Sequence, residues 1–155
     1  MTRTAYEETS VSVETSQAQI RKLLQKFGVE RMRYTSLPSE ALLEFVRMDK
    51  GKAIPYRITI RPKLKYGRNV DKDLDRAERQ VWRVVMWWLK AKLEAIEFGL
   101  LEFEREMLPF MLISDSQGHT STVGDVLPKH LEGALSPGED PFQGVRPALP
   151  PGEET

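Results

Sequence analysis

The spacing of apolar and polar residues predicts one very long helix, from Asp71 to Ile113. Its centre is apolar nearly all the way round, because Arg83 is the only polar residue between Val81 and Leu89. A helix that is hydrophobic on more than one face needs cover on each of those faces. The pattern therefore predicts either a sheet together with a further covering element, or an oligomer.

Gly99 falls inside this predicted helix. Apolar residues at Leu100, Phe103 and Met107 keep the helical period beyond the glycine. We therefore expect the helix to continue past it with a bend, and to end before a polar loop at residues 114–122.

Two shorter patterns open the chain. Val11 and Val13 alternate with polar residues, which predicts a short strand. Ser16 with Gln19 three residues later is typical of a capping box, and the apolar spacing that follows predicts a helix as far as Phe27. Gly28 would then end that helix in the left-handed conformation.

Three alternating runs come next, at Arg31–Leu37, Ala41–Met48 and Ile54–Ile60, and turn residues separate them. They predict a three-stranded antiparallel meander. In the third run Tyr56 and the isoleucines point to one face. Pro55 must lie at a strand start or on an edge strand, because it has no N–H to donate to a ladder.

The predicted fold is α+β, with an N-terminal helix and an antiparallel meander packed on the long central helix. We expect one domain over residues 11–132, preceded by a flexible N-terminus over residues 1–10. A short helix is expected to begin near Thr122 and to break at Pro128. Residues 133–155 are rich in proline, glycine and acid, and are predicted to be a disordered tail.

Composition removes several classes of protein. The 155 residues contain no cysteine, which excludes disulfides, thiolate metal sites and cysteine nucleophiles. The N-terminus lacks an apolar signal core, and the Val81–Leu89 run is about half the length that crosses a bilayer. We expect a soluble cytoplasmic protein without a membrane partner.

No catalytic motif stands out. The two histidines, His119 and His130, have no ligand spacing with each other or with a cysteine. The Asp71, Asp73 and Asp75 run resembles a calcium loop but lacks its sixth-position glycine and twelfth-position glutamate. The sequence predicts no catalytic residue, no metal site, no cofactor and no enzyme activity.

Charge is unevenly distributed. Between Lys50 and Val70 there are seven basic residues and no acid, whereas residues 113–155 hold seven acids and two bases. This asymmetry indicates a polyanionic partner or intramolecular pairing with the acidic tail. The alternative is that the basic run is only the solvated outer face of a strand.

Three motifs together resemble a known family. They are Arg79-Gln80-x-Trp82-Arg83, the block Lys90-Ala91-Lys92-Leu93-Glu94-Ala95-Ile96-Glu97-x-Gly99, and Thr122-Val123-Gly124-Asp125-Val126-Leu127-Pro128. They look like small uncharacterised proteins of tailed phages, prophages and related mobile elements, which implies the cytoplasm of a host cell. The topology is also similar to the core of single-strand annealing proteins, which hold DNA in a basic groove and assemble into rings.

Two sets of site residues follow. The predicted nucleic-acid surface consists of Arg57, Arg61, Lys63, Lys65, Tyr66 and Arg68. The predicted subunit interface consists of Trp82, Arg83, Trp87 and Trp88, and Trp87 could instead be a platform on which a base stacks.

Lys92 lies on the presumed core face of the long helix. Its ammonium group is expected to reach the edge of the core or to pair with Glu78 or with a neighbouring chain. The alternative is a functional buried lysine.

The leading hypothesis is a non-enzymatic phage or mobile-element protein in DNA transactions, which binds single-stranded nucleic acid and forms a homo-oligomer. The alternative is a protein-interaction factor that binds and modulates a host or phage enzyme without touching nucleic acid. Salt dependence separates the two hypotheses, because binding through phosphates weakens steeply with salt.

Overall fold

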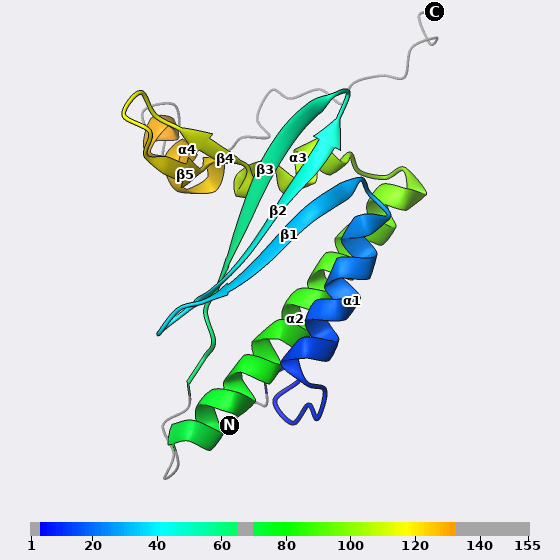
Figure 1. The fold of residues 1–155 in the computed structure, drawn as a ribbon, viewed down its shortest axis with the longest axis vertical. Coiled ribbons are helices and arrows are strands. Elements are labelled where there is room, and N and C mark those ends of the chain that lie inside the picture. Colours follow the sequence, from blue (N-terminus) through cyan, green and yellow to red (C-terminus); the bar gives the residue numbers. More distant parts are fainter. Residues whose placement is uncertain (1–3, 65–69, 133–155) are drawn as a thin grey trace, which may run out of the picture.

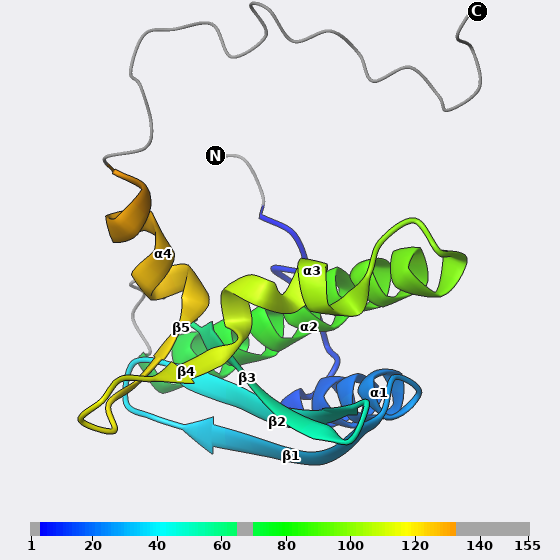
Figure 2. The same ribbon diagram turned by 90° about the horizontal axis from the view of Figure 1, so that it is seen from above.

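The computed structural model describes residues 4–64 and 70–132. A three-stranded antiparallel sheet is covered on one face by helices, and its other face is uncovered (Figures 1 and 2). The fold is α+β, as predicted. The elements are α1 (Val13–Gln25), β1 (Val29–Ser36), β2 (Ala41–Asp49), β3 (Lys52–Ile60), α2 (Val70–Phe98), α3 (Phe103–Met107), the 3-10 turn η1 (Leu108–Phe110), β4 (Leu112–Ser114), β5 (Thr120–Thr122) and α4 (Val123–Leu131).

The meander has the predicted order, β1-β2-β3. Pro55 lies on the edge strand β3 opposite Val46, where the ladder tolerates a residue without an N–H. On the first strand the register shifts between Val29 and Arg31, which marks a bulge near the start of β1. Gly28, with φ of 80°, makes the predicted left-handed turn from α1 into β1.

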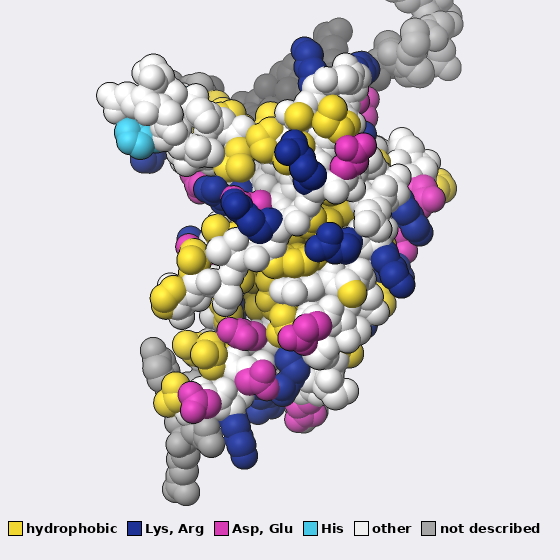
Figure 3. Space-filling model, viewed as in Figure 1, with side chains coloured by type: hydrophobic (Ala, Val, Ile, Leu, Met, Phe, Trp, Pro, Cys, Tyr) yellow, Lys and Arg dark blue, Asp and Glu magenta, His cyan; other side chains and the backbone are white. Residues whose placement is uncertain are grey.

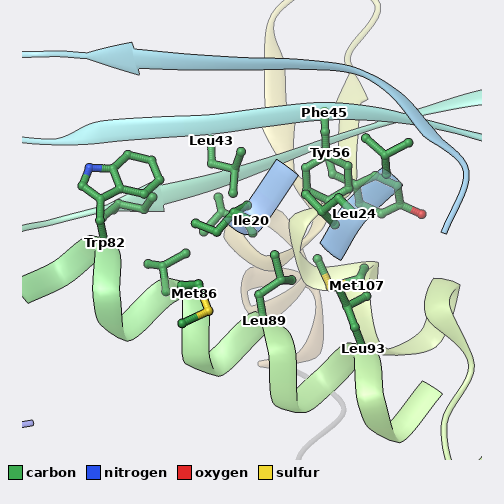
Figure 4. Close-up of a cluster of buried hydrophobic side chains, with 14 of the residues drawn as sticks. Ile20, Leu24, Leu43, Phe45, Tyr56, Trp82, Met86, Leu89, Leu93 and Met107 are labelled. Carbon is green, nitrogen blue, oxygen red and sulfur yellow. The ribbon is translucent and has the colours of Figure 1, made fainter. Parts of the chain in front are cut away.

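The core lies between the sheet and the helices (Figure 4). From α2, the side chains of Trp82, Met86, Leu89 and Leu93 point at the sheet, and each is at most 4% exposed. Their spacing of three and four residues keeps them on one helical face. The strands and α1 supply the opposing side chains, which are Ile20, Leu24, Leu43, Phe45 and Tyr56.

The prediction that the long helix continues to Ile113 is wrong. Gly99 has φ of 89°, a left-handed conformation that ends α2 at Phe98. The chain then turns back and places Phe103 and Met107 of α3 in the core. The apolar period beyond Gly99 therefore belongs to a second short helix rather than to the same one.

The apolar centre of α2 receives its cover from within the chain. The sheet covers one side and α1 packs along another. On a third side, Trp88 meets Phe110 of η1 edge to face, with ring centroids 5.4 Å apart. The structure thus contains the first of the two predicted arrangements, a sheet together with further covering elements.

The start of α1 also differs from the prediction. Residues 11 and 12 are not a strand, and Ser12 rather than Ser16 caps the helix, since its hydroxyl accepts a hydrogen bond from the Thr15 N–H at 3.1 Å. Ser16 is a fully buried helical residue. Residues 4–9, predicted to be flexible, contact α2 through hydrogen bonds from Arg76 and Gln80.

The helix predicted near Thr122 is present as α4. Thr122 caps it by accepting from the Asp125 N–H at 3.3 Å. Pro128 was expected to break this helix but lies inside it, and α4 continues to Leu131. Pro128 is the sixth residue of α4, beyond the first turn, so it removes one intrahelical hydrogen bond without ending the helix. The predicted disordered tail, residues 133–155, lies outside the described residues.

Candidate nucleic-acid interface

The uncovered face of the sheet carries a row of cationic side chains. Strand alternation places Arg31 and Arg33 of β1 and Arg57 of β3 on this face, opposite the core residues between them. Figure 3 looks toward this side of the molecule and shows Lys and Arg side chains over the strands, with acidic side chains gathered toward the lower end of the view. Hydrophobic side chains lie in the middle of this view, and the basic groups lie above and beside them.

Glu44 of β2 lies at the middle of this face, between two arginines. The register pairs it with Arg33 on one side and with Arg57 on the other. Arg33 Nε donates to Oε2 at 2.8 Å, and Arg57 Nε and Nη2 donate to Oε1 at 3.0 and 2.8 Å. One carboxylate thus fixes two guanidinium groups, and the cluster keeps an excess positive charge.

The electrostatics of Glu44 follow from this arrangement. Burial on its own would raise the pKa of the carboxyl group, whose side chain is only 11% exposed. Hydrogen bonds and charges from Arg33 and Arg57 outweigh burial, so the pKa lies below its ordinary value. The carboxylate is therefore charged at neutral pH.

The predicted nucleic-acid residues divide into four groups. Arg57 was expected to face solvent, but its side chain is 29% exposed and is held by Glu44. Arg61 is exposed and pairs with Glu40 at 3.2 Å. Lys63 borders a small hollow at the start of α2 rather than the sheet face. The other three, Lys65, Tyr66 and Arg68, lie outside the described residues.

Sequence reasoning missed the two arginines of β1 and the carboxylate between the strands. The basic run at Lys50–Val70 contains no acid, so Arg57 looked unpaired. Its partner Glu44 is 13 residues away and becomes a neighbour only through the β2–β3 register. Aligning the three predicted strands by their hairpin turns would have placed Arg33, Glu44 and Arg57 in one row.

No aromatic ring lies on this face among the described residues of the sheet. Tyr34, Phe45 and Tyr56 all belong to the core side. The apolar contribution comes instead from Val46 and Pro55, which line a hollow of about 290 Å³ together with Leu112 of β4. This face offers charge and aliphatic contact rather than base stacking.

Of the predicted interface residues, Trp82 is a core residue. It is 4% exposed and packs edge to face on Tyr34, with ring centroids 5.4 Å apart. The prediction that Trp82 contributes to a subunit contact is wrong, because Trp82 lies on the face of α2 that points at the sheet. Trp88 is also occupied within the chain, by Phe110.

Trp87 remains at the surface of α2 and is 38% exposed. Two cations lie against its ring, Arg83 at 5.3 Å and Lys90 at 5.0 Å from the centroid. Arg83 also donates to Gln19 Oε1 of α1 at 2.6 Å. Because Trp87 lies on the side of α2 opposite the sheet, it cannot act together with the basic sheet face on one short ligand.

Lys92 is partnered by α3. Its Nζ donates to Glu106 Oε2 at 2.7 Å and lies 5.4 Å from the centre of the Trp88 ring. The expected partner Glu78 lies elsewhere, in the wall of a cavity near the β1–β2 hairpin. This ion pair joins α2 to α3, so we assign Lys92 a structural role.

The β4–β5 turn holds His119 close to Asp115, with 3.0 Å between His119 Nδ1 and Asp115 Oδ2. Asp115 also accepts from the backbone N–H groups of His119 and Gln117, which lower the pKa of the carboxyl group. The carboxylate therefore caps the turn. In residues 4–64 and 70–132, no group of three or more metal-ligating side chains is placed to hold an ion.

In comparisons with protein-family models, with curated proteins and with solved structures, nothing matched this chain. None of the helices in the described part of the chain is long and apolar enough to span a membrane.

Proposed function

We propose that this chain is a non-enzymatic nucleic-acid-binding protein that acts in DNA transactions of a phage or mobile element, in the cytoplasm of the host cell. It binds single strands through the uncovered face of the sheet. The observation that carries this proposal is the row in which Glu44 holds Arg33 and Arg57 side by side. Arginines that are already oriented lose less freedom when they bind phosphate.

The mode of binding follows from the composition of the face. Arg31, Arg33 and Arg61 are exposed cations, and the guanidinium groups of arginine match the oxygens of a phosphate. The described part of the face has no ring for stacking, so binding through it is electrostatic and independent of base sequence. Stacking on Tyr66 remains a prediction, because that residue lies outside the described chain.

A salt titration tests this proposal. We expect the triple substitution Arg31→Gln, Arg33→Gln and Arg61→Gln to weaken binding of a labelled single-stranded oligonucleotide at least about tenfold at low salt. Each lost phosphate contact removes about 0.7 from the slope of log affinity against log salt, so the slope should fall by roughly 2. Fluorescence anisotropy at several salt concentrations measures both quantities.

The matched control removes three exposed cations from other surfaces: Lys22→Gln, Lys26→Gln and Arg105→Gln. This variant has the same net charge as the test variant and should bind nearly as well as the wild type. Equal loss in both variants would show that only overall charge matters. A wild-type protein without salt-sensitive binding would refute the proposal.

A second function is favoured by the apolar hollow on the same face. Val46, Pro55 and Leu112 leave about 290 Å³ that a side chain of another protein could fill. This supports the alternative, a factor that binds and modulates a host or phage enzyme. Such a contact would persist at salt concentrations that abolish binding to phosphates.

Homo-oligomerisation also remains a proposal, and it now depends on Trp87 alone among the three tryptophans. Replacing Trp87 by Gln should shift an assembly toward the monomer in light scattering, with little change in melting temperature because the ring is partly exposed. A wild-type protein that is monomeric at high concentration would contradict oligomerisation through this surface.

A further inference from the structure

A cavity of about 310 Å³ lies between the start of α1, the β1–β2 hairpin and the first half of α2, away from the basic row. We refer to it as the hairpin cavity. Its apolar wall includes Val13, Leu37, Pro62, Leu74 and Trp82. The volume falls at the lower end of the range found for ligand sites.

The described part of the polar wall of the hairpin cavity is anionic or neutral. Its charged residues within the described part of the chain are Glu14 of α1, Glu40 before β2 and Glu78 of α2, and no Lys, Arg or His among the described residues lines it. Glu40 pairs with Arg61, whereas Glu14 and Glu78 form no ion pair with any described residue. Three separate elements thus bring carboxylates to the edge of an apolar space.

A hydrogen-bond donor also lies in the wall of this cavity. Trp82 is 4% exposed, and its indole N–H has no hydrogen-bond partner among the described residues. Figure 4 shows the indole nitrogen on the side of the ring that is turned toward the N-terminal part of α2, from which Leu74 and Glu78 line the cavity. Because this N–H has no acceptor among the described residues, a ligand that supplies a carbonyl oxygen gains a hydrogen bond there.

We propose that the hairpin cavity binds an extended segment of a partner protein that presents a lysine or arginine beside apolar residues. The cationic group pairs with Glu14 and Glu78, and its aliphatic stem packs on the apolar wall. A backbone carbonyl of the segment accepts the Trp82 N–H. An extended peptide supplies the cation, the apolar surface and the free carbonyl together, which a simple amine does not.

The two carboxylates that this proposal uses, Glu14 and Glu78, lie outside the proposed nucleic-acid surface. They come from α1 and α2, whereas the nucleic-acid surface uses arginines of the strands. A variant of Glu78 should therefore leave oligonucleotide binding unchanged. The failure of one proposal would not imply the failure of the other.

The test uses the full chain and two immobilised libraries of acetylated hexapeptides. In both libraries a fixed central residue is followed by proline and flanked by random residues. The central residue is arginine in one library and neutral citrulline in the other. We expect retention on the arginine library to be about tenfold higher at low salt, because only arginine forms charge-assisted hydrogen bonds with carboxylates. Glu78→Gln should remove most of that difference, whereas Glu97→Gln, the same charge change at the far end of α2, should not.

Nuclear magnetic resonance locates the binding. Addition of a selected arginine peptide should shift the indole N–H signal of Trp82 downfield and leave that of Trp87 in place, with Trp82→Phe used to assign the signal. Equal retention on both libraries, or an unchanged Trp82 signal, would overturn the proposal. Equally tight binding of butylguanidine would also overturn it, because the ligand would then be a small cation. Binding seen only after deletion of residues 133–155 would overturn it as well, because the chain's own tail would then fill the cavity.

Discussion

Replacing Leu89 by Ala is expected to lower the free energy of unfolding by about 3 kcal/mol, within the range measured for leucine truncations in cores. Leu89 is fully buried and lies at the centre of the α2 face that packs on the sheet (Figure 4). The sheet and α1 both contact α2, so the space cannot close by moving one element alone. For a domain of this size the melting temperature should fall by roughly 10 °C.

The matched control for this prediction is Leu100→Ala. Leu100 is 71% exposed just beyond the end of α2, so the same loss of atoms should cost less than about 0.5 kcal/mol. Urea unfolding of both variants measures the two values. If both substitutions had equal effects, the assignment of Leu89 to the main core would be wrong.

The second large loss of stability is expected when Glu44 is replaced. Replacing it by Gln leaves Arg33 and Arg57 facing each other without a charged partner. The carboxylate is largely buried but Arg33 is 72% exposed, so solvent screens part of the lost interaction. We expect the free energy of unfolding to fall by about 2 kcal/mol at pH 7. Circular dichroism during denaturant unfolding measures this difference.

The pH dependence gives this prediction an internal check. The folded-state pKa of Glu44 lies below its ordinary value of 4.5, so its contribution is fully present above that value and is lost as the pH falls through the folded pKa. The stability gap between wild type and Glu44→Gln should therefore be constant from pH 6 to 7 and should narrow below about pH 4.5. A gap that stays unchanged down to pH 3 would contradict the assigned role of the carboxylate.

The strands were predictable because their signals are local. Alternation of apolar residues gave Ala41–Met48 and Ile54–Ile60 almost at their observed bounds, and the turns between them set the antiparallel order. Pro55 was predicted to lie at a strand start or on an edge strand because it has no N–H, and it lies on the edge strand β3. The covering of α2 was also foreseen in outline, since a two-sided apolar helix requires more than one neighbour.

The errors arose where two structures share one pattern. The apolar spacing beyond Gly99 fits a continued helix as well as a second helix, and only the backbone angle at Gly99 separates them. Val11 and Val13 alternate like a strand, but the helix already begins at Val13 because Ser12 provides the cap. Trp82 and Trp87 differ in exposure because five residues place them about 140° apart around the helix, so that Trp82 faces the sheet and Trp87 lies at the surface.

The candidate site was harder to predict than the fold because it depends on contacts across the sheet. Arg57 was identified as basic, but its pairing with Glu44 requires the strand register. Trp82 was predicted to lie in a subunit interface. Only the folded structure shows that it lines a cavity together with Glu78. Single-residue chemistry can be read from the sequence, whereas the sign of a local charge cluster depends on tertiary structure.

The bulge at the start of β1 affects how copies of this protein meet in concentrated solution. β1 is an outer strand of the described sheet, and such an edge can pair with the edge of another molecule and seed polymers. The register shift between Val29 and Arg31 twists this edge, and a second copy docking there would bring arginines of both molecules together. The features that make the sheet face basic therefore also resist aggregation through the sheet edge.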